Sequence, residues 1–169
     1  LFGVALGQRS IAYRYRHLFH DFLREQAARE PEAVHIRHRR AAEYFIVHDQ
    51  LEEAIYHWLA AQDFEAAAQA IEQAGEPAVR AGRLDTVANW IDALPPQVIV
   101  DHPLLQAYLG DVYRLRSRFD EALDWYAVAE RAWRAGGDVA GISRALRGQA
   151  LVYLDTVRPA QAESLLEEA

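Results

Sequence analysis

The sequence predicts an all-α protein built from stacked helical hairpins that form a right-handed superhelix, preceded by a short strand–helix remnant. From Pro31 onward the apolar residues recur with helical spacing, and no segment shows the alternation typical of a strand. Small and bulky apolar residues also recur at the same offsets in four places, which indicates a repeat. The chain has 169 residues, of which 51% are apolar, so it can bury a substantial core.

The first 29 residues differ from the rest. Residues 11–16 alternate large apolar or aromatic side chains with small or charged ones, which is the period of a half-buried strand. Directly after this segment, Phe19, Phe22 and Leu23 share one face of a helix. A strand that leads into an amphipathic helix is not typical of a helical repeat. We therefore interpret residues 1–29 as the end of a separate small module.

The remaining sequence predicts eight helices. Gly75, Pro77 and Gly82 are expected to lie in connections, because glycine and proline are the strongest local breakers of helices. Leu94 should end a helix, since the residue before a proline avoids the α region, and residues 95–103 form the clearest boundary. The expected helices cover residues 31–48, 51–61, 64–74, 84–94, 104–117, 120–135, 139–156 and 159–169.

Four groups of anchor residues define the repeat. Relative to the first member of a group, the others lie 9, 13 and 16 positions further on. The first anchor fills the gap between paired helices, and the small second anchor lets the next helix approach closely. A hairpin cannot bury its apolar face alone, so the units have to stack. The groups are Phe45, Ala54, Trp58, Ala61; Ala78, Val87, Ile91, Leu94; Tyr113, Ala122, Tyr126, Ala129; and Tyr153, Ala162, Leu166, Ala169.

The third group matches the tetratricopeptide pattern at five positions. Leu109-Gly110-x-x-Tyr113 is followed by Ala122-x-x-x-Tyr126. Two positions depart from the pattern, because Gln106 replaces the expected tryptophan and Arg134 replaces the expected proline. The second group has Gly75 and Pro77 within its first helix, so we expect an irregular hairpin there.

Composition and motifs exclude several function classes. The net charge of −7 argues against direct nucleic-acid binding, and the basic runs 37–40 and 114–118 are interpreted as solvated faces with ion pairs. No apolar run reaches the length of a membrane span, no secretory signal is visible, and cysteine is absent, so we expect a cytoplasmic protein. The sequence contains no phosphate-binding loop, nucleophile elbow or zinc-protease motif, so we expect neither an enzyme nor a cofactor.

Histidine and tryptophan residues are interpreted as structural. Two histidine pairs, at 17/20 and 35/38, have the spacing of helical metal ligands, but no third ligand supports them, so no metal is expected. Trp58 and Trp90 lie in or beside anchor positions and should belong to the core. Trp125 and Trp133 lie outside the anchor positions, which leaves two alternatives: packing between repeats or a stacking platform for a sugar or another ring.

Several segments resemble a known family of regulators. In their order and spacing they are similar to the large ATP-dependent transcriptional activators of the LuxR family, MalT type, and the resemblance is strongest from residue 13 to residue 95. The segments are Tyr13-Arg14-Tyr15-Arg16-His17-Leu18-Phe19-His20-Asp21-Phe22-Leu23-Arg24-Glu25, His38-Arg39-Arg40-Ala41-Ala42-Glu43-Tyr44-Phe45, Leu51-Glu52-Glu53-Ala54-Ile55-Tyr56-His57-Trp58, Phe64-Glu65-Ala66-Ala67 and Trp90-Ile91-Asp92-Ala93-Leu94-Pro95.

The resemblance implies a division of the chain and a function. Residues 1–29 would end a winged-helix module, and the rest would begin the helical sensor region. Within that region, the boundary at residues 95–103 and the repeat pattern themselves predict irregular helical hairpins over residues 30–94 and tetratricopeptide-like repeats over residues 95–169. The chain would then be part of a sensor region that binds an inducer or regulatory protein and can self-associate. ATP hydrolysis and DNA binding would belong to parts of a longer protein, which fits the absence of methionine and the abrupt last helix. The alternative is a stand-alone tetratricopeptide adaptor that assembles protein complexes.

The repeat also predicts where a ligand or partner would bind. The first helices of successive hairpins line the concave face of such stacks. We count two and six positions back and one position forward from Phe45, Tyr113 and Tyr153 and keep the polar residues. Arg144 is added because it lies one turn before Arg147. The arginines could hold an acidic peptide or anion, or could pair with Asp111 and Asp155 in a solvated network. The candidate binding residues are Arg39, Glu43, Asp111, Arg114, Arg144 and Arg147.

Overall fold

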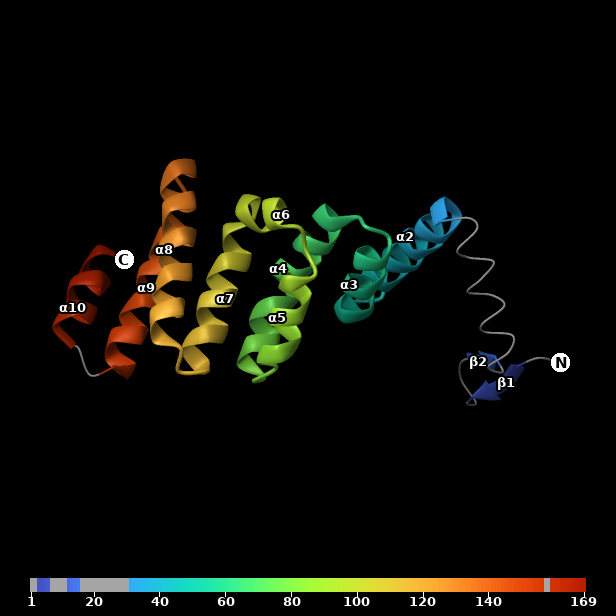
Figure 1. Ribbon diagram of the computed structural model, residues 1–169, viewed down its shortest axis with the longest axis horizontal. Coiled ribbons are helices and arrows are strands. Elements are labelled where there is room, and N and C mark those ends of the chain that lie inside the picture. The colour runs from blue at the N-terminus through green and yellow to red at the C-terminus, as the bar shows by residue number, and fades with distance from the viewer. Residues whose placement is uncertain (1–2, 7–11, 16–30, 157–158) are drawn as a thin grey trace.

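The computed structural model describes residues 3–6, 12–15, 31–156 and 159–169 (Figure 1). In these residues it contains one antiparallel β-hairpin, formed by β1 (Gly3–Leu6) and β2 (Ala12–Tyr15), and nine helices. The helices are α2 (Pro31–Val47), α3 (Leu51–Ala60), α4 (Phe64–Arg80), α5 (Leu84–Asp92), α6 (Pro96–Asp101), α7 (Pro103–Leu115), α8 (Phe119–Gly136), α9 (Val139–Asp155) and α10 (Pro159–Glu168).

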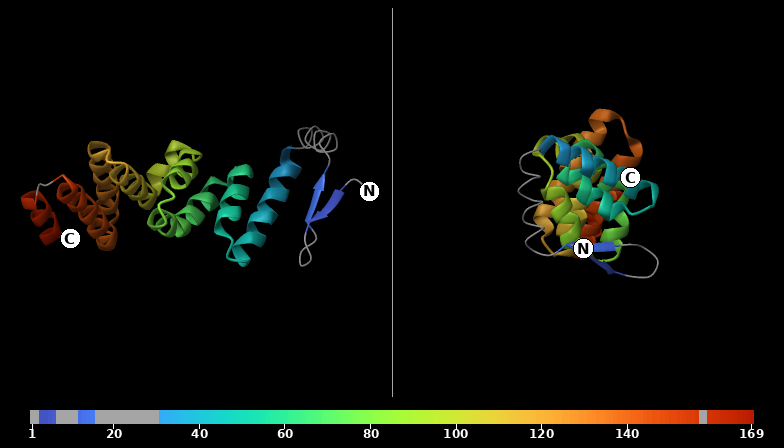
Figure 2. Two further views of the ribbon diagram at one scale, coloured as in Figure 1. Left: turned by 90° about the horizontal axis from the view of Figure 1, so that it is seen from below. Right: turned by 90° about the vertical axis from the view of Figure 1, so that its right-hand side faces the viewer.

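The fold class predicted from the repeat is confirmed. Four helical hairpins, α2–α3, α4–α5, α7–α8 and α9–α10, follow one another in chain order along the long axis, and Figure 2 shows the same stack from two further directions. The strand expected over residues 11–16 corresponds to β2. Its partner β1 was not predicted, and the register pairs Gly3 with Tyr15 and Leu6 with Ala12. The helix expected after this strand lies outside the described residues.

The turns explain why the first anchor of each unit has a fixed place. In three hairpins the carbonyl oxygen of this anchor accepts a hydrogen bond from the backbone N–H five residues further on, which closes the last helical turn. One residue of each turn has a positive φ, which costs least at Gly82 (φ 72°). The bonds are Gln50 to Phe45, Arg83 to Ala78 and Arg118 to Tyr113, each 2.9 Å long.

The anchors in the second helices form the contacts expected of them. The small anchors Ala54, Ala122 and Ala162 are buried, and so is the bulky anchor Tyr126. The corresponding Leu166 in α10 is half exposed, at 50%, because the described chain has no further first helix to cover it. Trp58 and Trp133 lie in the core, and Trp90 and Trp125 pack against it.

Helix α4 corrects the prediction that the chain breaks at Gly75 and Pro77. The helix runs through both residues to Arg80, and the irregular hairpin expected there is absent from this described part of the chain. Gly75 lies directly against the ring of Tyr108 in α7, where a Cβ atom would collide with the ring. Buried residues on both sides, such as Ala74 and Ala78, hold the helix in the core. Packing therefore outweighs the local preference of the two residues.

The expected boundary over residues 95–103 carries the short helix α6 and lies inside a continuous core. One cluster of buried residues includes Leu94 before this segment and Leu105 and Tyr108 after it. Gln106, which departs from the tetratricopeptide pattern, explains how α6 is held. Its buried Nε2 donates to the carbonyl oxygens of Ile99 (2.8 Å) and Val100 (3.2 Å), which are near the end of α6.

A histidine fastens the junction between α6 and α7 to α4. Nδ1 of His102 lies 3.0 Å from Oε1 of Glu72, and Nε2 lies 3.1 Å from Oε2 of Glu65. Only the doubly protonated ring can donate at both nitrogens. Burial lowers the pKa of His102, but its hydrogen bonds to the two carboxylates outweigh this effect, and the pKa is raised.

We predict that the His102 contact makes the stack more stable in mild acid. Because the folded pKa is raised, the contribution of His102 is fully present below the unfolded pKa of about 6.5 and is lost as the pH rises through the folded pKa. His102→Gln should therefore lower the free energy of unfolding more at about pH 5.5 than at about pH 8. Urea denaturation at both pH values measures this difference.

His57 provides a control with the opposite sign. Its Nδ1 lies 2.7 Å from Nδ1 of His38, and burial, together with the charge of His38, lowers the pKa of His57. Protonation of His57 is therefore less favourable in the folded chain, and the stability it contributes falls as the pH drops below about 6.5. His57→Asn should raise stability at the lower pH relative to the higher one. The assignment is wrong if both variants respond to pH in the same direction.

Candidate functional site

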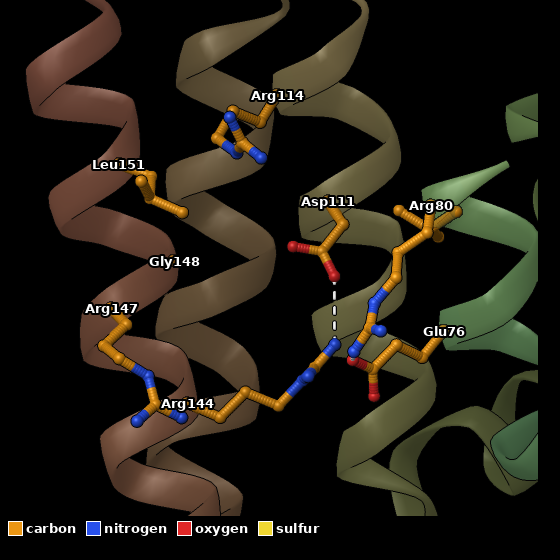
Figure 3. Close-up of a pocket in the computed structure, with 9 residues that line it drawn as sticks. Glu76, Arg80, Asp111, Arg114, Arg144, Arg147, Gly148 and Leu151 are labelled. Carbon is orange, nitrogen blue, oxygen red and sulfur yellow. Dashed lines mark hydrogen bonds and ion pairs between the residues drawn. The ribbon is translucent and has the colours of Figure 1, made fainter. Parts of the chain in front are cut away.

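The candidate site is a pocket of about 320 Å³ between the first helices of three hairpins. Helix α7 lies beside both α4 and α9, so side chains from all three helices reach the same opening (Figure 3). Four of the residues that line it are arginines, in a chain whose net charge is −7. The lining residues are Glu76, Val79 and Arg80 from α4, Asp111 and Arg114 from α7, and Arg144, Arg147, Gly148 and Leu151 from α9.

Asp111 is the centre of the hydrogen-bond network in this arginine pocket. Its Oδ1 accepts from the hydroxyl of Tyr126 (2.6 Å), and its Oδ2 accepts from Nη2 of Arg144 (3.0 Å). Figure 3 shows Arg144 reaching from α9 across to Asp111 on α7. The guanidinium of Arg144 also lies 5.2 Å from the ring centre of Tyr108, within the range of a cation–π contact. Asp111 and Tyr108 thus fix the direction of Arg144.

Burial raises the pKa of Asp111, although the hydrogen bond from Tyr126 and the nearby arginines Arg144 and Arg114 oppose this shift. Burial and the neighbouring Asp111 carboxylate also raise the pKa of Tyr126, so its hydroxyl remains protonated and donates its hydrogen bond. Two glycines make room for the ring of Tyr126 beside Asp111. The ring of Tyr126 lies between Gly110 and Gly148, where a Cβ atom on either glycine would collide with the ring.

The four arginines differ in what they already contact. Arg80 pairs with Glu76 in α4, and Arg114 pairs with Asp155 at 3.0 Å. The Nε atoms of Arg114 and Arg144 are buried and have no hydrogen-bond partner in the described structure. Arg147 is exposed, and no carboxylate of the described residues lies within ion-pair distance of it. One further negative group would therefore complete the charge balance of the pocket.

Comparison with known proteins supports the repeat assignment for the second half of the chain. Residues 103–169 match the family model of the tetratricopeptide repeat. These residues comprise α7 to α10, and the five-position pattern lies in the first of these two hairpins, α7–α8. No curated protein and no solved structure matches the chain.

The structure brings four of the six predicted binding residues together. Asp111, Arg114, Arg144 and Arg147 all line the pocket of the tetratricopeptide region. The two pairings that were weighed as the alternative are also present, from Arg144 to Asp111 and from Arg114 to Asp155. The alternatives are thus compatible, because the ion pairs orient two guanidinium groups at the rim of the pocket and leave Arg147 without such a pair.

The other two predicted residues lie elsewhere. Arg39 and Glu43 are on α2, in the first hairpin, and neither lines the arginine pocket. Arg39 donates from Nε to Oδ2 of Asp63 at 3.1 Å, and Glu43 is exposed. The positions are equivalent along the repeat, but the first hairpin is separated from α7 and α9 by the second.

Sequence reasoning missed the contribution of α4 to the pocket. Glu76, Val79 and Arg80 line it, although the binding positions were counted only from the three aromatic anchors. The same count from Ala78, the first anchor of the second group, gives Glu76 and Val79 directly. The signal was therefore present, and the supposed break at Gly75 and Pro77 hid it.

No helix of the described residues is long and apolar enough to cross a membrane. The described part of the chain also has no group of three or more histidine, aspartate or glutamate residues arranged to hold a metal ion.

Proposed function

We propose that this chain is a regulatory sensor and protein-interaction region of a bacterial transcriptional activator, and that its concave helical surface binds an inducer or a partner protein. The helical-repeat fold and the tetratricopeptide match support a role in protein interaction. The ordered segments between residues 13 and 95, which resemble the MalT-type activators, support the assignment to a regulator. On this proposal the chain is cytoplasmic, is not an enzyme and holds no cofactor.

The observation that carries the proposal is the arginine pocket. Guanidinium groups bind carboxylates and phosphates in bidentate geometry, and three of those in the pocket are paired with carboxylates of the chain. Arg147 adds a charge that no described carboxylate neutralises. An acidic group of an inducer or partner would therefore gain a charge-assisted contact without displacing an existing ion pair.

An acidic probe tests the pocket directly. We expect a fluorescent peptide containing one glutamate to bind about tenfold more tightly than its glutamine counterpart at about 0.15 M salt, as measured by fluorescence anisotropy. Arg114→Glu combined with Arg147→Glu should abolish this preference while leaving the circular dichroism of the helices unchanged. In the full-length protein the same double variant should weaken the response to the inducer or partner.

The control variant carries the same change in charge outside the pocket. Arg37 and Arg40 are exposed on α2, and replacing both with glutamate alters the net charge equally. This control should bind the acidic peptide as the unmodified chain does. If both double variants lose binding to the same extent, the effect is one of net charge, and the pocket is not the site.

A stand-alone adaptor remains the second candidate, because the tetratricopeptide match concerns an interaction fold and not a regulator. The two candidates differ in the gene that encodes the chain. An upstream phosphate-binding loop and a downstream helix-turn-helix are expected for the regulator. An open reading frame that ends soon after residue 169 would support the adaptor instead.

A further inference from the structure

A second pocket, of about 420 Å³, lies beside the arginine pocket on the same helices. The two pockets share Arg144 and Arg147. The second pocket differs in chemistry, since Pro103 and Leu104 at the start of α7, Trp133 from α8 and Ala140 from α9 supply apolar surface. We call it the Trp133 pocket.

The wall of the Trp133 pocket is closely packed on its inner side. The indole of Trp133 is 8% exposed and packs against buried alanines of α7, α8 and α9. It lies directly against Gly141, where a Cβ atom would collide with the ring. Because the ring is held on all these sides, it presents a fixed apolar surface to whatever enters the pocket.

The acidic side chains that line the Trp133 pocket are engaged in contacts within the chain. Glu72 accepts from His102 at 3.0 Å, and Asp138 accepts from the backbone N–H of Gly141 at 3.0 Å as the N-cap of α9. The positive side chains Arg144 and Arg147 form the border with the arginine pocket. A ligand would therefore place apolar surface at one end and negative charge at the other.

The spacing of the two pockets suits an extended peptide. The lining residues on α9 shift by four positions, from Ala140–Arg147 in one pocket to Arg144–Leu151 in the other, which corresponds to about 6 Å along a helix. On α7 the step from Leu104 to Asp111 is longer, about 10 Å. Side chains two residues apart in an extended strand point the same way and lie about 6.6 Å apart. The length of a glutamate side chain accounts for the remaining distance between this spacing and the longer step of about 10 Å along α7.

We propose that the concave surface binds an extended peptide segment of a partner protein in which a bulky apolar side chain precedes or follows a glutamate by two residues. The apolar side chain occupies the Trp133 pocket, the glutamate carboxylate binds Arg147 in the arginine pocket, and Arg144 lies between them. This inference rests on the proposed function, because it identifies the class of partner for the same surface.

The carboxylate belongs to a side chain within the segment. The arginine pocket ends at Leu151, and the apolar surface of α9 continues beyond it to Leu154; these leucines are 43% and 48% exposed. A segment that passes over Arg147 can continue along this apolar surface, whereas a chain that ends at the arginine pocket would leave it uncovered.

Short fluorescein-labelled peptides with amidated C-termini test the inference by anisotropy. The two test peptides carry Leu-Ser-Glu or the reverse order, Glu-Ser-Leu, within a Gly-Ser background. We expect one of the two to bind at least about tenfold more tightly than the matching control in which serine replaces leucine, and than the matching control in which glutamine replaces glutamate. Moving leucine next to glutamate should remove this advantage, because neighbouring side chains of an extended chain point in opposite directions.

A matched pair of variants locates the apolar end. Ala140 is exposed and lines the Trp133 pocket, so Ala140→Gln partly fills it without disturbing the core. This variant should lose the contribution of leucine and keep that of glutamate. Ala135→Gln, at an exposed position of α8 outside both pockets, should bind like the unmodified chain.

The outcomes separate this inference from the proposed function. If glutamate strengthens binding and leucine adds nothing, the arginine pocket remains a site and the peptide inference is overturned. If only a peptide with a free C-terminal carboxylate binds, the carboxylate belongs to a chain end, and the inference is equally overturned. If no acidic peptide binds at all, both proposals fail.

Discussion

Tyr126→Ala should lower the free energy of unfolding by about 3–5 kcal/mol, because it removes a buried aromatic ring that joins three helices. The ring comes from α8 and fills the space between Gly110 on α7 and Gly148 on α9. No side chain of these two glycines can fill the cavity that the alanine leaves. The loss should therefore lie near the upper end of the range for aromatic-to-alanine changes.

Urea denaturation followed by circular dichroism measures this loss, and Tyr126→Phe is the matched control. Phenylalanine keeps the ring but removes the hydroxyl that donates to Asp111 at 2.6 Å, and it should cost only about 1–2 kcal/mol. The difference between the two variants isolates the packing of the ring. A loss below about 1 kcal/mol for the alanine variant would contradict the role of Tyr126 as the contact between the third and fourth hairpins.

Asp111→Leu should lower the free energy of unfolding by about 3 kcal/mol, since it leaves the Tyr126 hydroxyl and the Arg144 guanidinium without their shared acceptor. Both partners are largely removed from solvent: Tyr126 is 1% exposed, and the Arg144 side chain is 28% exposed. The cost of burying these groups unpaired is greater than the gain from adding an apolar side chain.

Asp111→Asn should change stability by less than about 1 kcal/mol at neutral pH. Burial raises the pKa of Asp111, so its ionised form is less favourable in the folded chain than in the unfolded one. The stability that Asp111 contributes is present below its unfolded pKa of about 3.9 and is lost as the pH rises through the folded pKa. The neutral amide removes the cost of burying an ionised carboxylate and still accepts a hydrogen bond from Tyr126.

The same Asp111→Asn variant should weaken binding of the acidic peptide about fivefold, because Arg144 loses the charged partner that fixes its direction. Denaturation at about pH 7 and at about pH 4, together with the anisotropy assay, checks both expectations. A loss of more than about 2 kcal/mol at neutral pH would show that the Arg144–Asp111 ion pair stabilises the fold more than burial of the carboxylate destabilises it.

The helices and the hairpin stack were predictable because their signals are local. The offsets of 9, 13 and 16 positions from Tyr113 follow from the helical period and from a turn that closes on the anchor's own carbonyl oxygen. The same arithmetic identified Asp111, Arg114 and Arg147, which line one pocket. All of these relations join residues within one hairpin, so the order of residue types along the chain is enough to predict them.

Only the tertiary structure decided the role of residues whose partners are distant in sequence. Glycine usually breaks helices, but Gly75 lies inside α4 because the ring of Tyr108 on α7 occupies the space that a side chain at this position would need. Gln106 departs from the repeat pattern and donates hydrogen bonds to carbonyl oxygens of α6. This helix was not predicted, because Pro95 and Pro96 indicated a boundary.

The sequence by itself determined the repeat, four of the residues that line the arginine pocket, and the arginine-rich character of the second half of the chain. The tertiary structure decided that Glu76 and Arg80 complete the arginine pocket and that Arg39 lies apart from it. It also decided that Trp133 lines the neighbouring Trp133 pocket. The physical reason is that a helix fixes the direction of a side chain locally. The neighbour that it meets depends on how closely the next hairpin approaches, and glycine–aromatic contacts such as Gly148–Tyr126 set that distance.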